Sequence, residues 1–293
     1  MTANTLHPVV ADARAREAEL RARYPDIFTP SIRHRARVVG IIVALTALLV
    51  FGLVQLEFSL PKLLLGLGKL AEFLWRMIPP STGGWSKFLI YLHALAETVA
   101  IAFLGVMAAA LLAFPFGFLA AKNVIPNAVV HFLSRRFLDT IRGVDELIWA
   151  LIWVSVVGLG PFAGVLALVT ANFGVFGKLF SEAIEAADRK AVEGVASVGG
   201  SGLDAMRFGL LPQILPVIGS QVLYYFESNT RSATIIGIVG AGGIGLHLAE
   251  QIRVLEYQHV SALILMILIT VMAIDVVSTR LRFALIGDGA QRR

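Results

Sequence analysis

Long apolar runs separated by short polar segments dominate the sequence. A helix that crosses the hydrocarbon core of a bilayer needs about 20 predominantly apolar residues. Runs of this order without any charged residue occupy 38–56, 98–121, 147–177, 209–226 and 232–249. A sixth run, 254–274, is interrupted only by Glu256. The pattern therefore predicts an all-α integral membrane protein.

Two of these runs do not fit one straight helix. The run 147–177 is too long, and Gly158-Leu159-Gly160-Pro161 at its centre predicts a hairpin. Its first arm then begins at about residue 135, which brings Arg142, Asp145 and Glu146 to the membrane edge. The run 232–249 holds five glycines. It is predicted to be a bend or re-entrant piece, because irregular backbone at membrane depth has to be covered by protein or water.

About six transmembrane helices result, at 38–56, 94–121, 135–157, 161–180, 209–231 and 257–279. With both termini in the cytoplasm, eighteen of the 25 Lys and Arg residues lie on the inner side and six on the outer side. This distribution agrees with the positive-inside rule. The net charge of +5 is explained by anionic lipid of the inner leaflet, so no nucleic-acid partner is expected.

The segment 57–80, between the first two spans, has a different pattern. Leucines recur at helical spacing, and Lys62, Lys69 and Arg76 recur every seven residues on another face. This is typical of a helix that lies in the outer membrane interface; a short helix packed under the next span is the alternative. Residues 1–30 are expected to form a soluble helix or a disordered arm.

Composition excludes several kinds of chemistry. The chain has no cysteine, which excludes disulfides and thiolate catalysis. Its six histidines show no metal-ligand spacing, and Gly240–Gly245 is not followed by the Lys of a phosphate-binding loop. We therefore expect no enzyme activity, metal or cofactor in this chain. An ion-driven secondary transporter is the alternative function, but the internal duplication typical of that class is not evident.

The polar block 181–212 is unusual in so apolar a chain. Glu193 is followed six residues later by Gly199, and Leu211-Pro212 closes the block. The spacing resembles the cytoplasmic coupling loop of ABC importer permeases, where Glu-Ala-Ala-x-x-x-Gly is followed after nine residues by Ile-x-Leu-Pro. Gly194 and Val195 replace the two alanines here, and Gly209 replaces the isoleucine.

From Glu97 to Arg282 the sequence resembles the permease subunit of phosphonate-type ABC importers, in the type I importer superfamily. The most specific matches are Phe226-Glu227-Ser228-Asn229-Thr230-Arg231-Ser232-Ala233 and Val239-Gly240-Ala241-Gly242-Gly243-Ile244-Gly245; further matches lie at 97–102, 158–168 and 177–185. Two departures concern local helix geometry. Asp145 stands where the family usually has proline, and 187–190 lacks the usual Gly-Pro pair.

The resemblance implies a type I importer permease fold and a homodimer of this subunit. It also implies two copies of a cytosolic ATPase, which bind the ATP and Mg, and an extracytoplasmic binding protein. The substrate would be phosphonate or a related phosphorus oxyanion, either phosphite or phosphate. The implied location is the bacterial inner membrane. The domains would be a cytoplasmic arm (1–37), the first span with the outer interfacial helix (38–93), the permease core (94–282) and a cytoplasmic tail (283–293).

Three groups of residues are candidates for function. The ATPase-coupling loop is predicted to act through Glu193, Gly199, Gly200, Asp204, Arg207, Leu211 and Pro212. Glu227 and Arg231 share a helix face and either line the substrate pathway near the outer gate, together with Asn229, or form a structural ion pair. The glycines of 237–245 either allow close helix packing or form an unwound gate with free N–H groups; the candidates are Gly240, Gly242, Gly243 and Gly245.

Two other acidic positions have simpler interpretations. Glu97 is expected at the start of the second span, where the helix dipole favours an acid. Arg142 and Glu146, four residues apart, are expected to pair or to reach the ATPase or the inner gate.

Overall fold

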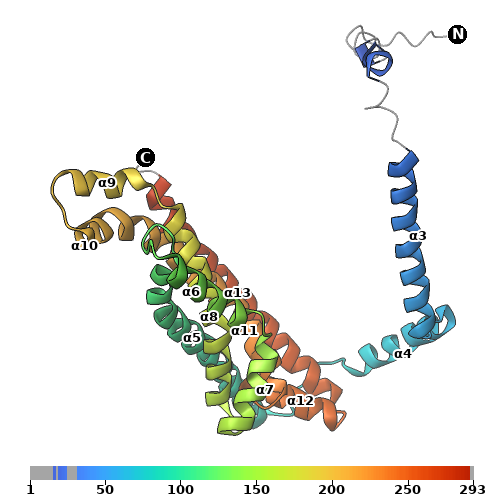
Figure 1. The fold of residues 1–293 in the computed structure, drawn as a ribbon. Coiled ribbons are helices and arrows are strands. Elements are labelled where there is room, and N and C mark those ends of the chain that lie inside the picture. Colours follow the sequence, from blue (N-terminus) through green and yellow to red (C-terminus); the bar gives the residue numbers. More distant parts are fainter. Residues whose placement is uncertain (1–15, 18, 25–31, 291–293) are drawn as a thin grey trace, which may run out of the picture. The chain divides into compact units, whose positions relative to one another are not determined.

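A computed structural model describes residues 16–17, 19–24 and 32–290 of the chain (Figure 1). The described residues are helical or in turns and contain no strand, which confirms the predicted all-α class. The chain divides into two compact units between Glu72 and Phe73. The part of the arm at 1–15, 18 and 25–31 and the tail at 291–293 lie outside the described residues.

The first unit contains the predicted first span. Helix α3 (Ile32–Gln55) includes a 21-residue apolar segment, Arg35–Gln55, with 0% of its span window buried within the chain. Helix α4 (Leu60–Arg76) follows and has no buried residue. The segment 57–80 thus contains a helix, and its position in the outer interface stays a prediction.

The second unit is a bundle built on α5 (Trp85–Ala120), α8 (Pro161–Ala186), α11 (Leu211–Ile238) and α13 (Tyr257–Ala290). α5 and α8 run close together because small residues face the crossing. A Cβ at Gly105 would lie 2.6 Å from the Cβ of Leu168, and one at Gly117 would lie 2.8 Å from that of Phe180. Close approach through small residues is the usual basis of helix association in membranes.

The second span begins earlier than predicted. α5 starts at Trp85 and not at residue 94, so Glu97 lies inside the helix and not at its beginning. The predicted start was based on uncharged runs, so it left out the first turns of α5, which carry Lys87 and His93.

The third span is not the continuous helix predicted at 135–157. The chain forms α6 (Ala128–Arg142) and, after a break, α7 (Glu146–Val157). Asp145 starts α7 as its N-cap, since its side chain accepts a 2.9 Å hydrogen bond from the N–H of Leu147. Arg142 and Glu146 consequently belong to different helices, and their four-residue spacing does not place them on one helical face.

Helix length and composition identify four helices in the described residues as long and apolar enough to cross a membrane. A fifth crossing results if the helical segment Gly202–Ile238 and α12 (Gly243–Arg253), which meet at 44°, count as one bent span. The prediction of about six spans also counts the α6–α7 pair, and that count remains a prediction. Figure 1 shows α9 and α10 at one end of the second unit and α7 and α12 at the other.

Candidate functional site

The predicted coupling loop forms a short helical hairpin at one end of the bundle (Figure 1). Its first residues, 181–186, complete the last turns of α8, and α9 (Arg189–Ser197) begins after two extended residues, Ala187 and Asp188. The Asp188 side chain caps α9 by accepting a 3.0 Å bond from the N–H of Lys190. An aspartate cap therefore starts α9 where the family usually has a Gly-Pro pair.

Gly199 and Gly200 form the turn that ends α9. The N–H of Gly200 donates to the carbonyl of Val195 at 3.1 Å, and the N–H of Gly199 donates to that of Ala196 at 3.0 Å. This is the Schellman pattern, in which the first residue beyond the cap is left-handed. Gly199 has φ of +88°, a conformation that other L-residues adopt only at a cost.

The return segment starts with α10 (Gly202–Asp204) and leads directly into a π-helix, η1 (Ala205–Leu210). Ser201 and Asp204 form a capping box. The Ser201 hydroxyl and backbone N–H both donate to the Asp204 carboxylate, and they hold the pKa of Asp204 below its usual value. η1 ends directly before Leu211 and Pro212, and Pro212 has no N–H to continue regular α-helical bonding to the preceding turn.

α9 packs directly against η1. A Cβ at Gly209 would lie 2.8 Å from the Cα of Val192, so the isoleucine usual in the family would not fit this crossing. Outside the crossing, Glu193 and Arg207 are exposed, and so are the large apolar side chains of Val198, Leu203 and Phe208. The hairpin thus presents apolar side chains among charged ones at its surface.

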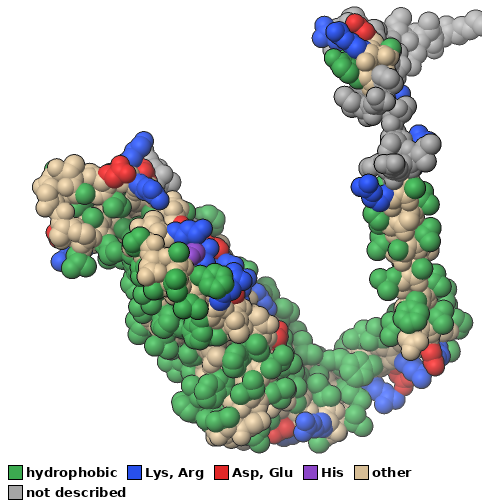
Figure 2. Space-filling model, in the orientation of Figure 1, with side chains coloured by type: hydrophobic (Ala, Val, Ile, Leu, Met, Phe, Trp, Pro, Cys, Tyr) green, Lys and Arg blue, Asp and Glu red, His purple; other side chains and the backbone are tan. Residues whose placement is uncertain are grey.

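Figure 2 shows charged side chains gathered at this end of the second unit and an apolar surface along its helices. The hairpin also forms one wall of a hollow of about 510 Å³. The side chains around the hollow that carry charge are Lys122, Arg189 and Glu193. The polar end and the apolar flank suit a segment that emerges from a membrane into water.

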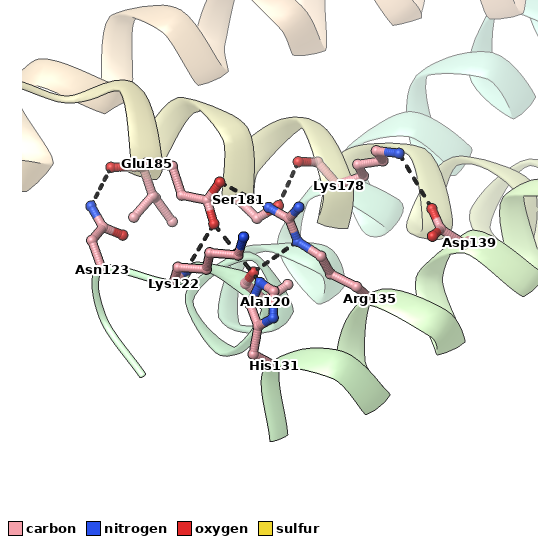
Figure 3. Close-up of polar contacts among 10 residues, drawn as sticks. Ala120, Lys122, Asn123, His131, Arg135, Asp139, Lys178, Ser181 and Glu185 are labelled. Carbon is pink, nitrogen blue, oxygen red and sulfur yellow. Dashed lines mark hydrogen bonds and ion pairs between the residues drawn. The ribbon is translucent and has the colours of Figure 1, made fainter. Parts of the chain in front are cut away.

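A group of polar contacts that the sequence did not reveal joins the hairpin to the rest of the bundle (Figure 3). Glu185, in the last turn of α8, accepts a 2.8 Å bond from the N–H of Lys122 and pairs with Arg135 of α6 at 2.9 Å. Asn123 donates to the carbonyl of Ile184 at 2.8 Å. Glu185 therefore fastens the α5–α6 connection and α6 itself to the point where the chain enters the coupling hairpin.

A second charged group lies within the membrane helices. Glu227 of α11 pairs with Arg231, Oε1 to Nη1, at 3.4 Å. Its other oxygen pairs with Nη2 of Arg282, on α13, at 3.1 Å. The Glu227 side chain is 10% exposed, that of Arg282 23% and that of Arg231 51%. The pairing predicted between Glu227 and Arg231 is present, and Arg282 is a partner that the sequence analysis did not identify.

Asn229 does not share the exposed side of this cluster. It is buried and exchanges two hydrogen bonds, of 2.9 and 3.1 Å, with Asn172 of α8. Asn172 lies near the middle of the 26-residue α8. Glu227 and Arg231 each lie two residues from Asn229, or about 3 Å along the helix axis. Arg231 therefore lies about 3 Å beyond the middle of α8, on the side away from the hairpin, and its position near the outer gate stays a prediction.

The glycine-rich stretch forms the bend between α11 and α12. Gly240, Gly242 and Gly243 have φ of +99°, +81° and +70°. A Cβ at Gly237 would lie 2.5 Å from the carbonyl oxygen of Gly242, and one at Gly245 would overlap that of Thr234. This geometry favours the close-packing interpretation.

The N–H groups that begin α12 are already occupied. Gly243 donates to the Glu97 carboxylate at 2.9 Å, and Ile244 donates to the Thr98 hydroxyl at 2.8 Å. The Glu97 carboxylate therefore lies at a helix N-terminus, where the helix dipole favours an acid. That helix is α12, however, and not α5, to which Glu97 belongs.

Comparison with known proteins identifies the family. Residues 113–286 match the family described as the binding-protein-dependent transport system inner membrane component. The chain belongs to this family. The permease is 38% identical to the putative phosphite transport system permease protein HtxC of Stutzerimonas stutzeri, over 79% of the chain and 80% of the relative. It is also 38% identical to the phosphate-import permease protein PhnE of Mycolicibacterium smegmatis, over 76% of the chain and 43% of the relative.

A solved structure shares the fold of the permease. The inward-facing MetNI methionine ABC transporter gives a TM-score of 0.61 at 19% identity. The match covers 69% of this chain and 99% of the matched transporter chain. The predicted family and the type I importer permease fold are thereby confirmed. The chain is an inner membrane transport component, and its family works with ATPase and binding-protein partners.

Proposed function

We propose that this permease forms the membrane pathway of an ATP-driven importer for a phosphorus oxyanion, either phosphonate, phosphite or phosphate. The observation that carries the proposal is the charged cluster at the mid-height of the bundle. Arginine has a planar, permanently charged fork suited to oxyanions, and charged side chains inside membrane spans commonly mark a transport route. The names of the relatives, which refer to phosphite and phosphate transport, support the same substrate class.

The hairpin of α9 and α10 is the proposed docking site for a cytosolic ATPase. The ATPase would bind the ATP and Mg, and no cofactor is proposed for the permease itself. Val198, Leu203 and Phe208 supply exposed apolar side chains for a groove in the partner. Glu193 and Arg207 would form the charged rim, while Gly199, Gly200 and Asp204 fix the shape of the tip. Leu211 and Pro212 join the hairpin to α11.

The assembly would contain two copies of the permease, related by a two-fold axis. Arg231 supports this arrangement, because a half-exposed guanidinium at the mid-height of a membrane helix requires water or a polar partner beside it. A central pathway between two copies provides both. An extracytoplasmic binding protein would deliver the substrate to the end formed by α7 and α12.

The proposed orientation places the hairpin and both termini in the cytoplasm. Leu285, near the end of α13, lies 3.4 Å from a Cβ built on Gly219, close to the start of α11. The C-terminal end of α13 is therefore on the same side as the hairpin. The arginines of the N-terminal segment support a cytoplasmic position for that segment as well, by the positive-inside rule.

The test is reconstitution with the cytosolic ATPase and the extracytoplasmic binding protein that are proposed as partners. We expect the complex in nanodiscs to hydrolyse ATP faster when the binding protein carries its ligand, and proteoliposomes to accumulate phosphite, methylphosphonate or phosphate only with ATP. Accumulation driven by a proton or sodium gradient without ATP would contradict the proposal and favour a secondary transporter. ATP-driven uptake of none of the three oxyanions would contradict the proposed substrate class.

A further inference from the structure

The cluster of Glu227, Arg231 and Arg282 holds one carboxylate between two guanidinium groups that come from different helices. Arg231 approaches from α11 itself. Arg282 lies near the inner end of α13, and its side chain reaches the carboxylate at the mid-height of α11. The two arginines therefore converge on one point that lies within the membrane part of the bundle.

The cluster holds more guanidinium groups than a simple ion pair. Arg231 and Arg282 both contact the Glu227 carboxylate, while a second carboxylate, Asp275 of α13, is linked to Arg282 only through the Thr279 hydroxyl, which donates to Asp275 at 3.5 Å. Placing a charge within a span is costly, and a purely structural pair would need only one arginine. The second guanidinium on Glu227, beyond what a structural pair needs, indicates that the cluster is arranged for a further anion.

The arginines also retain hydrogen-bonding capacity. A guanidinium has five N–H donors. Arg282 directs donors to Glu227, to the carbonyl of Ser278 at 3.4 Å and to the hydroxyl of Thr279 at 2.9 Å. Arg231 directs one donor to Glu227 at 3.4 Å, and about half of its side chain is exposed. Its fork has room for a second oxygen ligand.

We propose that Arg231 and Arg282 together form an oxyanion site on the transport pathway, and that Glu227 is an internal anion which holds the two arginines until a substrate oxyanion replaces it. The inference rests on the proposed function and adds Arg282 to it as a residue that contacts substrate. A carboxylate and a phosphorus oxyanion accept the same charge-assisted hydrogen bonds. The substrate can then bind at mid-depth when it displaces Glu227 from the two arginines, and it leaves when the Glu227 carboxylate binds them again.

A structural role for the cluster would be to fasten α11 to α13. The two helices have a separate connection, since the Ser278 hydroxyl donates to the carbonyl of Leu223 at 3.0 Å. The decisive variant is therefore the double change Glu227→Gln with Arg282→Gln. It keeps hydrogen-bonding side chains at both positions and removes one carboxylate together with one guanidinium, so the net charge of the cluster is unchanged and Arg231 is the guanidinium that remains.

The experiment uses the full complex with its ATPase and binding protein. Complex yield, ATP hydrolysis stimulated by loaded binding protein, and uptake of phosphite, methylphosphonate and phosphate are measured for the double variant, for Arg282→Lys and for Glu227→Gln. The matched control is Arg280→Gln, which removes an exposed arginine from the same helix two residues away.

We expect the double variant to assemble normally and to keep its stimulated ATP hydrolysis. Its uptake should fall roughly tenfold to a hundredfold, the equivalent of one charge-assisted hydrogen-bonding group. Arg282→Lys should lose much of its uptake, because lysine keeps the positive charge but lacks the planar guanidinium that can bind two oxygens. Glu227→Gln should lower both the KM and the maximal rate, because the substrate binds without a competitor and leaves slowly. Arg280→Gln should transport like the unaltered complex.

Two outcomes would overturn the inference while the proposed function stands. One is a double variant that transports as well as the unaltered complex. The other is a double variant that fails to assemble, since this would show that the cluster is a structural connection. If the unaltered complex imports none of the three oxyanions, the proposed substrate class fails first and the oxyanion site fails with it.

Discussion

Single side chains decide how the helices of this permease begin and how closely they approach. Asp145 and Asp188 each accept a hydrogen bond from a helix N-terminus, and both stand at points where the family usually has proline-containing sequence. Glu97 does the same for α12 from a position far away in the sequence. Local caps of this kind are visible in a sequence, because donor and acceptor are two residues apart. The Glu97 contact is not visible in the sequence, because its donor and acceptor are 146 residues apart.

Gly245 provides a test of the close packing at the α11–α12 bend. A Cβ at this position would overlap the carbonyl oxygen of Thr234, so Gly245→Ala should destabilise the permease by about 1–3 kcal/mol, as overpacking usually does. The measurement is the yield and thermal stability of the purified complex. Gly219→Ala in α11 is the control, because the nearest atom would be a Leu285 methyl at 3.4 Å. Equal stability of the two variants would contradict the packing interpretation.

Glu185 allows a similar test at the inner end of α8. Glu185→Gln removes the charge that Arg135 pairs with at 2.9 Å and weakens the bond from the N–H of Lys122. The two side chains are only about a quarter exposed, so we expect a loss of about 1–2 kcal/mol in stability. ATP hydrolysis per transported molecule should rise as well, since the α5–α6 connection is held less firmly to the start of the hairpin.

The control for Glu185 is Glu182→Gln, an exposed position one turn earlier on the same helix. If both variants keep the stability and the ATP-to-substrate ratio of the unaltered complex, Glu185 has no role in coupling.

At the scale of helices, the apolar runs predicted α3, α5, α8, α11 and α13, because a membrane helix is defined by its composition. They did not predict the break between α6 and α7. Nothing near Gly143 is as disruptive as proline, and Asp145 looked like a residue inside a span. The π-helix before Pro212 and the Asn172–Asn229 pair were also missed, because a single amide in an apolar run gives no sign of the partner it will meet.

The hairpin tip gives a prediction at this scale. Gly199→Leu places a branched side chain at φ of +88°, at a cost of about 1–2 kcal/mol. No other atom lies within 4 Å of the position, so the permease should fold but hold its tip in a different shape. We expect weaker retention of the ATPase in co-purification and a loss of ATP-driven uptake.

Gly194→Ala is the matched control in the same helix, where an added Cβ also meets nothing within 4 Å. Alanine is the better helix former, so this variant should retain the ATPase and transport normally. Normal ATPase retention and uptake by Gly199→Leu would show that the hairpin tip is not the docking site.

For the whole molecule, the half-exposed Arg231 side chain is the feature that a single copy leaves uncovered. We predict two permeases and two ATPases in the assembled importer, because one copy supplies only one side of a central pathway. Native mass spectrometry of the complex released from nanodiscs gives the subunit ratio directly. One permease with two ATPases would exclude the two-fold arrangement.

The connections of the hairpin to its two membrane helices are unequal in stiffness. On one side Ala187 and Asp188 are extended, and a change in two backbone dihedrals there can swing α9 without moving α8. On the other side the helical backbone is unbroken from Gly202 to Ile238. Roughly 35 Å of continuous helix separates the tip from Glu227, at about 1.5 Å per residue. We therefore expect a displacement of the tip to be transmitted along α11 toward Glu227 and Arg231, with less effect on α8.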